Sequence, residues 1–293
     1  MKSLTLELTG GIGNQLFSYA YATNLVKLFD MKLILDGSVT ERVLGRQADL
    51  FEFALAGEPQ RCEEDYSSLG LNMNRLLWRY PFTRMVSERN QSQVLSWDVN
   101  TSRFRTGGRL RGFFQGEEAL DAVNEEKEKL FALKNPSSNF MDLSQEIIEK
   151  NVTSIHVRRG DYRSYIENFG LLSASYYKSA VRENSPDDSS SNIWLFSDEP
   201  DATLSELKSV GIQVNHVVSP TELSVAETLK LMSLSKKLIT ANSTFSWWAG
   251  ALGENIEIVV PQPWYRKEDS WLRESALIPS SWKRHPADWV EDE

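Results

Sequence analysis

Residues 156–162, with the sequence HVRRGDY, hold the densest group of charged and polar side chains that could act on a ligand. They end an apolar run from Val152 to Val157, which predicts a strand that presents them at its carboxyl end. Open α/β sheets bind ligands at that edge. Because neighbouring strand residues face opposite ways, Arg158 and Arg159 are expected to act differently, one on a phosphate and one on an acid such as Asp161. Structural ion pairs for both arginines are the alternative.

A second group, ANSTFSWWAGALG at residues 241–253, predicts a strand that ends in Asn242, Ser243 and Thr244 and passes into a helix. Hydroxyls and backbone amides at a helix start can bind an anion. A plain helix cap by Ser243 or Thr244 explains the same residues equally well. The paired tryptophans that follow are more typical of core packing than of sugar binding.

A third group, GGIGNQLF at residues 10–17, predicts a tight turn between a strand and a helix. Gly11 and Gly13 would let a ligand approach the backbone closely, and Asn14 adds an amide at the helix start. The stretch resembles a dinucleotide-binding fingerprint in which Leu16 takes the place of the third glycine. A turn without a ligand is the alternative. Asp36, at the end of the next predicted strand, could serve as the ribose-binding acid of such a site.

Two more carboxylates stand where they could bind a nucleoside. Asp198 follows a predicted strand and could accept a ribose or base donor, or cap the next helix. Glu227, early in a later helix, could hold a base edge or complement the helix dipole. The chain has no Asp-X-Asp pair and only three dispersed histidines, so no metal site is expected.

Composition narrows the possible partners. The formal net charge of −9 argues against binding along a nucleic acid, so any phosphate site must be local. The single cysteine, Cys62, excludes an internal disulfide and fits a reducing compartment. The chain opens directly on a predicted strand, and it has no apolar run of the roughly 18 residues that span a bilayer. We therefore expect a cytoplasmic protein without an integral anchor, peripheral at the inner membrane at most.

The predicted elements fall into two βα arrays. The first runs from a strand at Leu4–Leu8 to a charged helix at Glu117–Leu130. The polar stretch Lys134–Asn139 predicts a linker, and the second array follows it. Alternating strands and helices favour parallel sheets, so we expect an α/β fold with two Rossmann-like domains, residues 1–135 and 136–293.

Taken together, HVRRGDY, the upstream GGIGNQLF and the downstream ANSTFSWW resemble the α-1,2-fucosyltransferases, glycosyltransferase family 11, of the bacterial type. The resemblance runs from about Leu6 to Pro261, and the motifs stand in the family's order. It implies a GT-B-type fold with a cleft between the domains. The donor GDP-fucose would bind the C-terminal domain, and a galactose-terminated glycan acceptor would contact mainly the N-terminal one. The implied reaction is inverting transfer of L-fucose from GDP-β-L-fucose to the 2-hydroxyl of a terminal β-galactose, without a metal or other cofactor.

The resemblance also implies roles for individual residues. Arg158 would bind the diphosphate and stabilise the departing GDP, with Asp161 fixing the arginine pair and Asn14 reaching the pyrophosphate or the reacting centre. Glu167 is a candidate general base, although the reaction does not require one. The remaining donor-binding candidates are His156, Arg159, Asp198, Asn242, Ser243, Thr244, Phe245, Gly11, Gly13 and Glu227.

Two other functions compete with this interpretation. A nicotinamide-dependent oxidoreductase would use the N-terminal glycine turn and Asp36, but the third glycine is missing. A non-catalytic sugar-nucleotide or glycan-binding protein would use the same arginine pocket without turnover. Acceptor choice is expected to depend on the aromatic and basic segment Trp78–Trp97 and on the loop after Arg163, which do not reveal the glycan.

Overall fold

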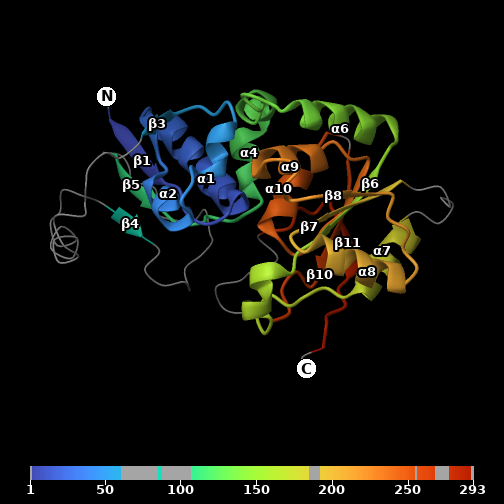
Figure 1. The fold of residues 1–293 in the computed structure, drawn as a ribbon. Helices are drawn as coiled ribbons and strands as arrows, with labels where there is room; N and C mark the ends of the chain where they lie inside the picture. Colours follow the sequence, from blue (N-terminus) through green and yellow to red (C-terminus); the bar gives the residue numbers. More distant parts are fainter. Residues whose placement is uncertain are drawn as a thin grey trace. The chain divides into compact units, whose positions relative to one another are not determined.

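The computed structural model describes residues 2–60, 85–87, 107–184, 192–254, 256–267 and 277–291. It divides into two compact units, Met1–Ala132 and Leu133–Glu293, each with its own parallel sheet (Figure 1). Cys62 and all of the segment Trp78–Trp97 except residues 85–87 lie outside the described residues. The functions assigned to the two expected domains stay predictions.

Unit 1 is built on a five-stranded sheet in the order β3-β2-β1-β5-β4, and its strand pairs are parallel. Its elements are β1 (Ser3–Glu7), α1 (Ile12–Phe29), β2 (Lys32–Asp36), α2 (Ser38–Leu44), η1 (Asp49–Glu52), β3 (Glu58–Gln60), β4 (Met85–Ser87), β5 (Gly108–Arg111), α4 (Glu118–Val123), η4 (Asn124–Glu126) and α5 (Lys127–Leu130). Leu4, Leu6 and Leu8 are fully buried, as expected for a central parallel strand covered on both faces. The long helix α1 is buried over most of its length and packs on α4.

Unit 2 carries a six-stranded sheet in the order β11-β10-β9-β6-β7-β8, again with parallel pairs. Its elements are α6 (Ser138–Glu149), β6 (Thr153–Val157), η5 (Gly160–Tyr165), α7 (Ala174–Asn184), β7 (Ile193–Ser197), α8 (Pro200–Ser209), β8 (His216–Val218), α9 (Val225–Met232), β9 (Lys237–Ile239), α10 (Thr244–Leu252), β10 (Glu257–Gln262) and β11 (Lys283–Pro286). Figure 1 shows α7 and α8 on one side of this sheet and α6, α9 and α10 on the other. Every residue of β6 and β7 is buried, so the two strands that lead into the candidate site have little freedom to move.

Two expected elements differ from the structure. The stretch predicted as a linker runs into the helix α6, because Ser137 caps it by accepting a hydrogen bond from the Phe140 amide at 3.1 Å. The spacing of the buried Phe140, Leu143 and Ile147 is that of one helix face and is the signal that could have revealed α6. The expected single helix over residues 117–130 is broken into α4, η4 and α5 around Asn124, a residue type that favours turns over helix interiors.

Candidate active site

The candidate site lies at the carboxyl edge of the sheet in unit 2. The chain moves outward from β6 through β7 to β8, then returns to the other side of β6 as β9. A reversal of strand order leaves a crevice outside the two central carboxyl ends, where open α/β sheets bind ligands. Residues 158–161 follow β6, residues 198–199 follow β7, and residues 240–243 join β9 to α10. The residues of HVRRGDY and ANSTFSWW and Asp198 are therefore brought to one edge of the sheet.

Arg158 is held by two carboxylates. Its Nη2 and Nε lie 2.7 and 3.0 Å from Asp161 Oδ1, and its Nη1 lies 3.1 Å from Asp198 Oδ2. The guanidinium carbon also stands 5.9 Å from the centre of the Tyr162 ring. The arginine side chain keeps 34% of its surface exposed, so part of the guanidinium remains available to a ligand. The two carboxylates therefore orient Arg158 and leave part of its guanidinium free to bind a ligand.

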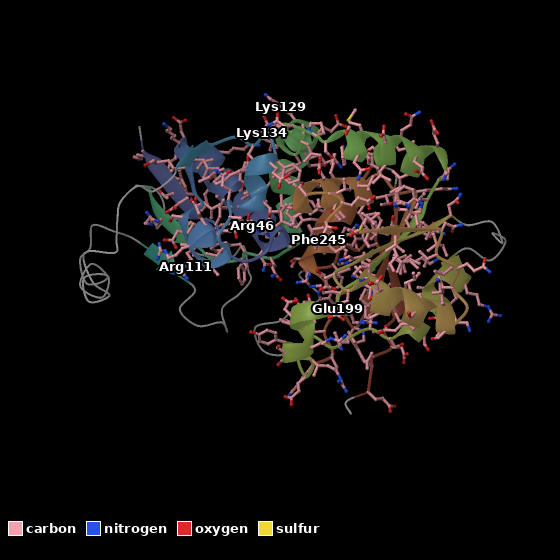
Figure 2. All side chains as sticks on the ribbon, in the orientation of Figure 1. Arg46, Arg111, Lys129, Lys134, Glu199 and Phe245 are labelled. Carbon is pink, nitrogen blue, oxygen red and sulfur yellow. The ribbon has the colours of Figure 1, made fainter. Side chains whose placement is uncertain are left out.

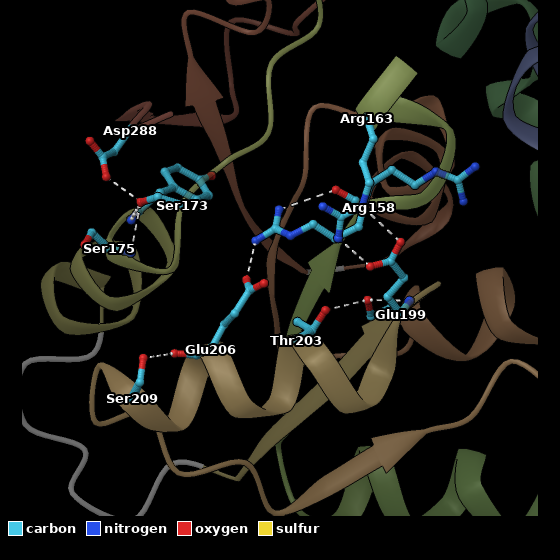
Figure 3. A network of polar contacts seen from close by, with 12 residues as sticks. Arg158, Arg163, Ser173, Ser175, Glu199, Thr203, Glu206, Ser209 and Asp288 are labelled. Carbon is cyan, nitrogen blue, oxygen red and sulfur yellow. Dashed lines mark hydrogen bonds and ion pairs between the residues drawn. The ribbon is translucent and has the colours of Figure 1, made fainter. Parts of the chain in front are cut away.

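Arg159 has a different environment from Arg158, although both residues stand just beyond the end of β6. Its side chain is 3% exposed, and its Nη2 donates to Glu206 Oε2 on α8 at 2.8 Å. Figure 3 shows Glu206 reaching from α8 to this arginine. Arg159 therefore forms the structural ion pair that was the alternative for it, and its role in binding the donor stays a prediction. Sequence reasoning missed Glu206, because it stands 47 residues from its partner and no local pattern marks it.

Asp198 connects both arginines. Its Oδ1 accepts the Arg159 backbone amide at 2.9 Å, while its Oδ2 pairs with Arg158. It does not cap α8, whose N-cap is Glu199. Gly160 lies against the same carboxylate, since a Cβ at this position would stand 2.6 Å from Asp198 Oδ2. A glycine at position 160 lets the backbone lie close to the Asp198 carboxylate. The motif alone does not reveal this reason for the glycine.

His156 is buried close to Arg158. Its ring centre lies 5.4 Å from that of Phe245, which stands in the first turn of α10 (Figure 2). Burial, followed by the positive charge of Arg158, lowers the pKa of His156 to about 3, so the imidazole is neutral at physiological pH. Its Nδ1 is buried and has no hydrogen-bond partner within the described part of the chain.

The start of α10 supplies a second polar feature. Ser243 is the N-cap, and its hydroxyl accepts from the Phe245 amide at 3.3 Å, so the helix-cap alternative is correct for this side chain. Thr244 and Phe245 are partly exposed, and the first-turn amides of a helix favour a negative charge. The side-chain Nδ2 of Asn242 donates to the Phe169 carbonyl at 2.6 Å, and the Asn242 backbone carbonyl accepts from the Tyr162 hydroxyl at 2.9 Å. The role of Asn242 in binding the donor stays a prediction.

Two predicted acids lie outside this arrangement. Glu227 forms a capping box with Ser224, and its Oε1 accepts the Ser137 amide at 2.6 Å. Both oxygens accept hydrogen bonds at helix starts, and the role of Glu227 on a base edge stays a prediction. Glu167 is exposed in the turn after η5, and no contact to Arg158 is found among the described residues. Its role as a base stays a prediction.

In unit 1, the glycine turn joins β1 to α1. Gly10 has a left-handed φ of 70°, Gly11 is the exposed N-cap of α1, and Gly13 is buried in the first turn of the helix. A Cβ on Gly11 would meet no atom within 4 Å, so open space lies beside its backbone. The Asn14 side chain is half-buried and accepts a hydrogen bond from Gln115 Nε2 at 2.9 Å. Gln115 is a second partner that sequence reasoning missed.

Asp36 does not have the character of a ribose-binding acid. It is 2% exposed, its Oδ1 accepts the Ser38 amide at 3.0 Å, and its Oδ2 lies 2.5 Å from Arg109. Arg109 also pairs with Glu7 at 3.1 Å. Both oxygens of Asp36 are used within the protein, which contradicts the role that the oxidoreductase interpretation requires.

Across the residues that the structure describes, no group of three or more His, Cys, Asp or Glu side chains could hold a metal ion. In the same described ranges, no helix combines the length and the apolar character needed to cross a bilayer.

The two parallel sheets form an α/β fold of the GT-B type, with two Rossmann-like units. A solved structure of POFUT1 in complex with GDP-fucose superposes with a TM-score of 0.52 at 10% identity, covering 88% of this chain and 97% of that one.

The chain belongs to glycosyl transferase family 11, which it matches over residues 111–283, more than half of its length. It is 28% identical over 295 residues to an alpha-1,2-colitosyltransferase of Escherichia coli, covering 97% of this chain and 99% of that protein. It is also 27% identical over 298 residues to the O-antigen biosynthesis glycosyltransferase WbnK of Escherichia coli, covering 90% of this chain and 98% of that protein. Family membership excludes the oxidoreductase alternative.

Proposed function

We propose that this glycosyltransferase moves L-fucose from GDP-β-L-fucose to the 2-hydroxyl of a terminal β-galactose, with inversion at the anomeric carbon. The observation that carries the proposal is the partly exposed Arg158 at the point where the strand order reverses, next to the start of α10. Together they offer a guanidinium and helix amides to a diphosphate. The α-1,2 linkage in the name of the colitosyltransferase supports the linkage, and the GDP-fucose bound to POFUT1 supports the donor.

The proposed reaction is a displacement at the anomeric carbon of fucose. The acceptor oxygen forms a bond to this carbon on the face opposite the diphosphate, while the bond from the carbon to the phosphate oxygen breaks. Negative charge then grows on the departing GDP. Arg158, preset by Asp161 and Asp198, stabilises that charge without reorganising. We propose that this arginine and the helix amides act without a metal ion.

The acceptor hydroxyl must lose its proton during transfer. Water or a phosphate oxygen of GDP can take it, and Glu167 is the carboxylate that we propose as an alternative base. Asn14 is proposed to donate an amide N–H to a substrate oxygen. His156 and Phe245 are proposed to contact the nucleoside, because the buried imidazole is neutral and keeps one ring nitrogen unpaired.

A second donor has a specific observation in its favour. The Escherichia coli relative is named for colitose, so the GDP-linked form of that sugar is the competing donor. We favour fucose because the motifs of this chain match the fucosyltransferases, but both donors enter the same diphosphate site. We further propose that the acceptor belongs to a bacterial surface polysaccharide, as the name of WbnK suggests, and that transfer takes place in the cytoplasm.

The test uses purified protein with GDP-fucose or the GDP-linked form of colitose, a panel of β-galactosides and excess EDTA. GDP release gives the rate, and NMR of the product gives the linkage. Arg158→Ala should lower kcat by roughly a hundredfold to a thousandfold, the usual effect of removing a group that stabilises developing charge. Arg163→Ala is the matched control, because Arg163 also pairs with an acid, Glu199, but is 54% exposed on η5.

Each outcome decides between named alternatives. Transfer to the galactose 2-hydroxyl that resists EDTA and is lost in Arg158→Ala supports the proposal. Transfer from the colitose donor alone would change the proposed donor sugar and leave the proposed diphosphate site unchanged. GDP binding without transfer to any acceptor in the panel favours the non-catalytic alternative, and the absence of GDP binding overturns the assignment of the site.

A further inference from the structure

A second polar pair lies at the carboxyl edge of the sheet in unit 1. β1 and β5 are neighbours in this sheet, so the segments that follow them emerge side by side. The first leads through the glycine turn to Asn14, and the second leads through residues 112–115 to Gln115. This is the edge at which α/β sheets bind ligands.

The hydrogen bond between the two side chains sets the orientation of an amide. Gln115 Nε2 donates to Asn14 Oδ1 at 2.9 Å, so the oxygen of Asn14 is occupied. Its Nδ2, with two N–H donors, has no partner within the described ranges. A Cβ on Gly10 would lie 3.2 Å from this nitrogen, so a larger residue there would crowd the amide. The arrangement presents Asn14 as a hydrogen-bond donor.

The turn that carries Gln115 is held in an uncommon conformation. Phe114, just before it, has a left-handed φ of 44°, which non-glycine residues rarely adopt. Its ring is buried and stacks on Tyr21 with a centroid distance of 4.3 Å and an interplanar angle of 4°. The Ser18 hydroxyl donates to the Gly112 carbonyl.

Asn14, Ser18 and Tyr21 share one face of α1, so this face holds the whole turn. Strained backbone persists only where its surroundings determine it, and such places often serve function. Here the packing on α1 fixes the position from which Gln115 reaches Asn14.

We infer that Gln115 is a positioning residue, which orients the Asn14 amide so that its N–H groups face a substrate oxygen. The inference rests on the proposed function of Asn14. A glutamine can donate to Oδ1, whereas a glutamate of the same size cannot do so at neutral pH. In Gln115→Glu, Asn14 would turn its Nδ2 toward the new carboxylate and present its oxygen to the substrate. The shape of the site stays the same, but the hydrogen-bond donor that Asn14 offers to the substrate is lost.

The test is a double-mutant cycle on the full chain. Gln115→Glu should lower kcat about tenfold, the effect of one lost hydrogen bond in the transition state, with little change in KM or melting temperature. Asn14→Ala should lower kcat further. Because Gln115 acts through Asn14, the double variant Asn14→Ala/Gln115→Glu should be no slower than Asn14→Ala alone. Gln145→Glu is the control, since Gln145 donates to the exposed Glu149 on α6.

A measurement without turnover separates this inference from the proposed function. The ¹⁵N-labelled side-chain amide of Asn14, assigned with Asn14→Asp, should shift strongly in Gln115→Glu as it begins to donate to a carboxylate. An unchanged signal overturns the inference, as does a kcat that is unaffected in Gln115→Glu or a double variant slower than Asn14→Ala. If the wild type transfers no sugar but the signal shifts, the proposed function fails and the orientation of the amide stands.

Discussion

At the scale of single residues, the site depends on one carboxylate with two tasks. Asp198 orients Arg158 through one oxygen and holds the backbone after β6 through the other. Any shift of this carboxylate therefore disturbs the guanidinium and the strand end together. The same crowding that fixes Asp198 makes Gly160 sensitive to substitution.

We expect Gly160→Ala to damage the site by moving Asp198. The new methyl group would stand 2.6 Å from Asp198 Oδ2, which should cost about 1–3 kcal/mol of unfolding free energy and weaken GDP binding. Gly11→Ala is the matched variant, because its φ of −73° suits alanine and its surroundings are open, so stability should change by less than about 1 kcal/mol. Urea unfolding and GDP titration measure both. Equal GDP affinity in Gly160→Ala and the wild type would contradict the assigned role of Asp198.

His156 should make stability depend on pH. Its pKa is about 3 in the folded protein and 6.5 as the ordinary value, so between these values the unfolded chain binds a proton that the folded chain does not. The free energy of unfolding should therefore fall as pH decreases through this window, by up to about 1.4 kcal/mol per pH unit. His156→Gln should flatten the profile measured by urea unfolding. Parallel profiles for the two proteins would show that His156 does not contribute.

At the scale of elements, Glu227 joins two helix starts. Its Oε2 accepts the Ser224 amide at 2.9 Å in the capping box of α9, and its Oε1 accepts the amide of Ser137, the N-cap of α6. Burial raises the pKa of Glu227, but the hydrogen bonds from Ser137 and Ser224 outweigh it and hold the pKa below the ordinary value. The ionised carboxylate therefore stabilises the fold above that ordinary value, and the contribution is lost as the pH falls through the folded pKa.

We expect Glu227→Ala to lower the free energy of unfolding at pH 7 by about 1–3 kcal/mol, because two helix amides lose a charged acceptor. Affinity for GDP should persist in the folded fraction. Glu149→Ala, on the exposed end of α6, should change stability by less than about 0.5 kcal/mol. Chemical denaturation measures the free energy of unfolding of each variant, and GDP titration measures its affinity. A loss of GDP affinity without a loss of stability would support the role of Glu227 on a base edge.

At the scale of the whole molecule, the chain is acidic, and the positive charge of the proposed phosphate site is confined to one region. The net charge is −9, yet Arg158 and the start of α10 offer positive potential at one edge of unit 2. We therefore propose that the donor binds unit 2, while the glycine turn of unit 1 offers open space beside Gly11.

Hydrogen exchange can test this division of function. Saturating GDP should slow amide exchange in residues 156–162, 196–199 and 240–246, because a ligand that binds the folded state suppresses local opening. Arg158→Ala should abolish this protection, and Arg163→Ala should keep it. Protection confined to unit 1 would reverse the assignment of the donor to unit 2.

Part of this organisation is local and could be predicted. The polar groups that end β6 and β9 follow apolar runs, so their meeting at one sheet edge follows from strand and helix patterning. Arg158 and Arg159 pair with different acids, as expected, but both stand beyond the end of β6, so strand alternation is not the cause. The helix α6 differs from the expected linker because polar residues are typical of linkers and of helix caps alike, and Ser137 is a cap.

By itself, the sequence determined the α/β class, the three motifs at strand ends and the family, because each depends on residues close together in the chain. Only the tertiary structure decided which side chains have structural roles and which remain available to a ligand. Glu206, Glu227 and Gln115 contact partners 47, 90 and 101 residues away. Such pairs depend on how strands and helices pack, and packing complementarity has no signature within a single stretch of sequence.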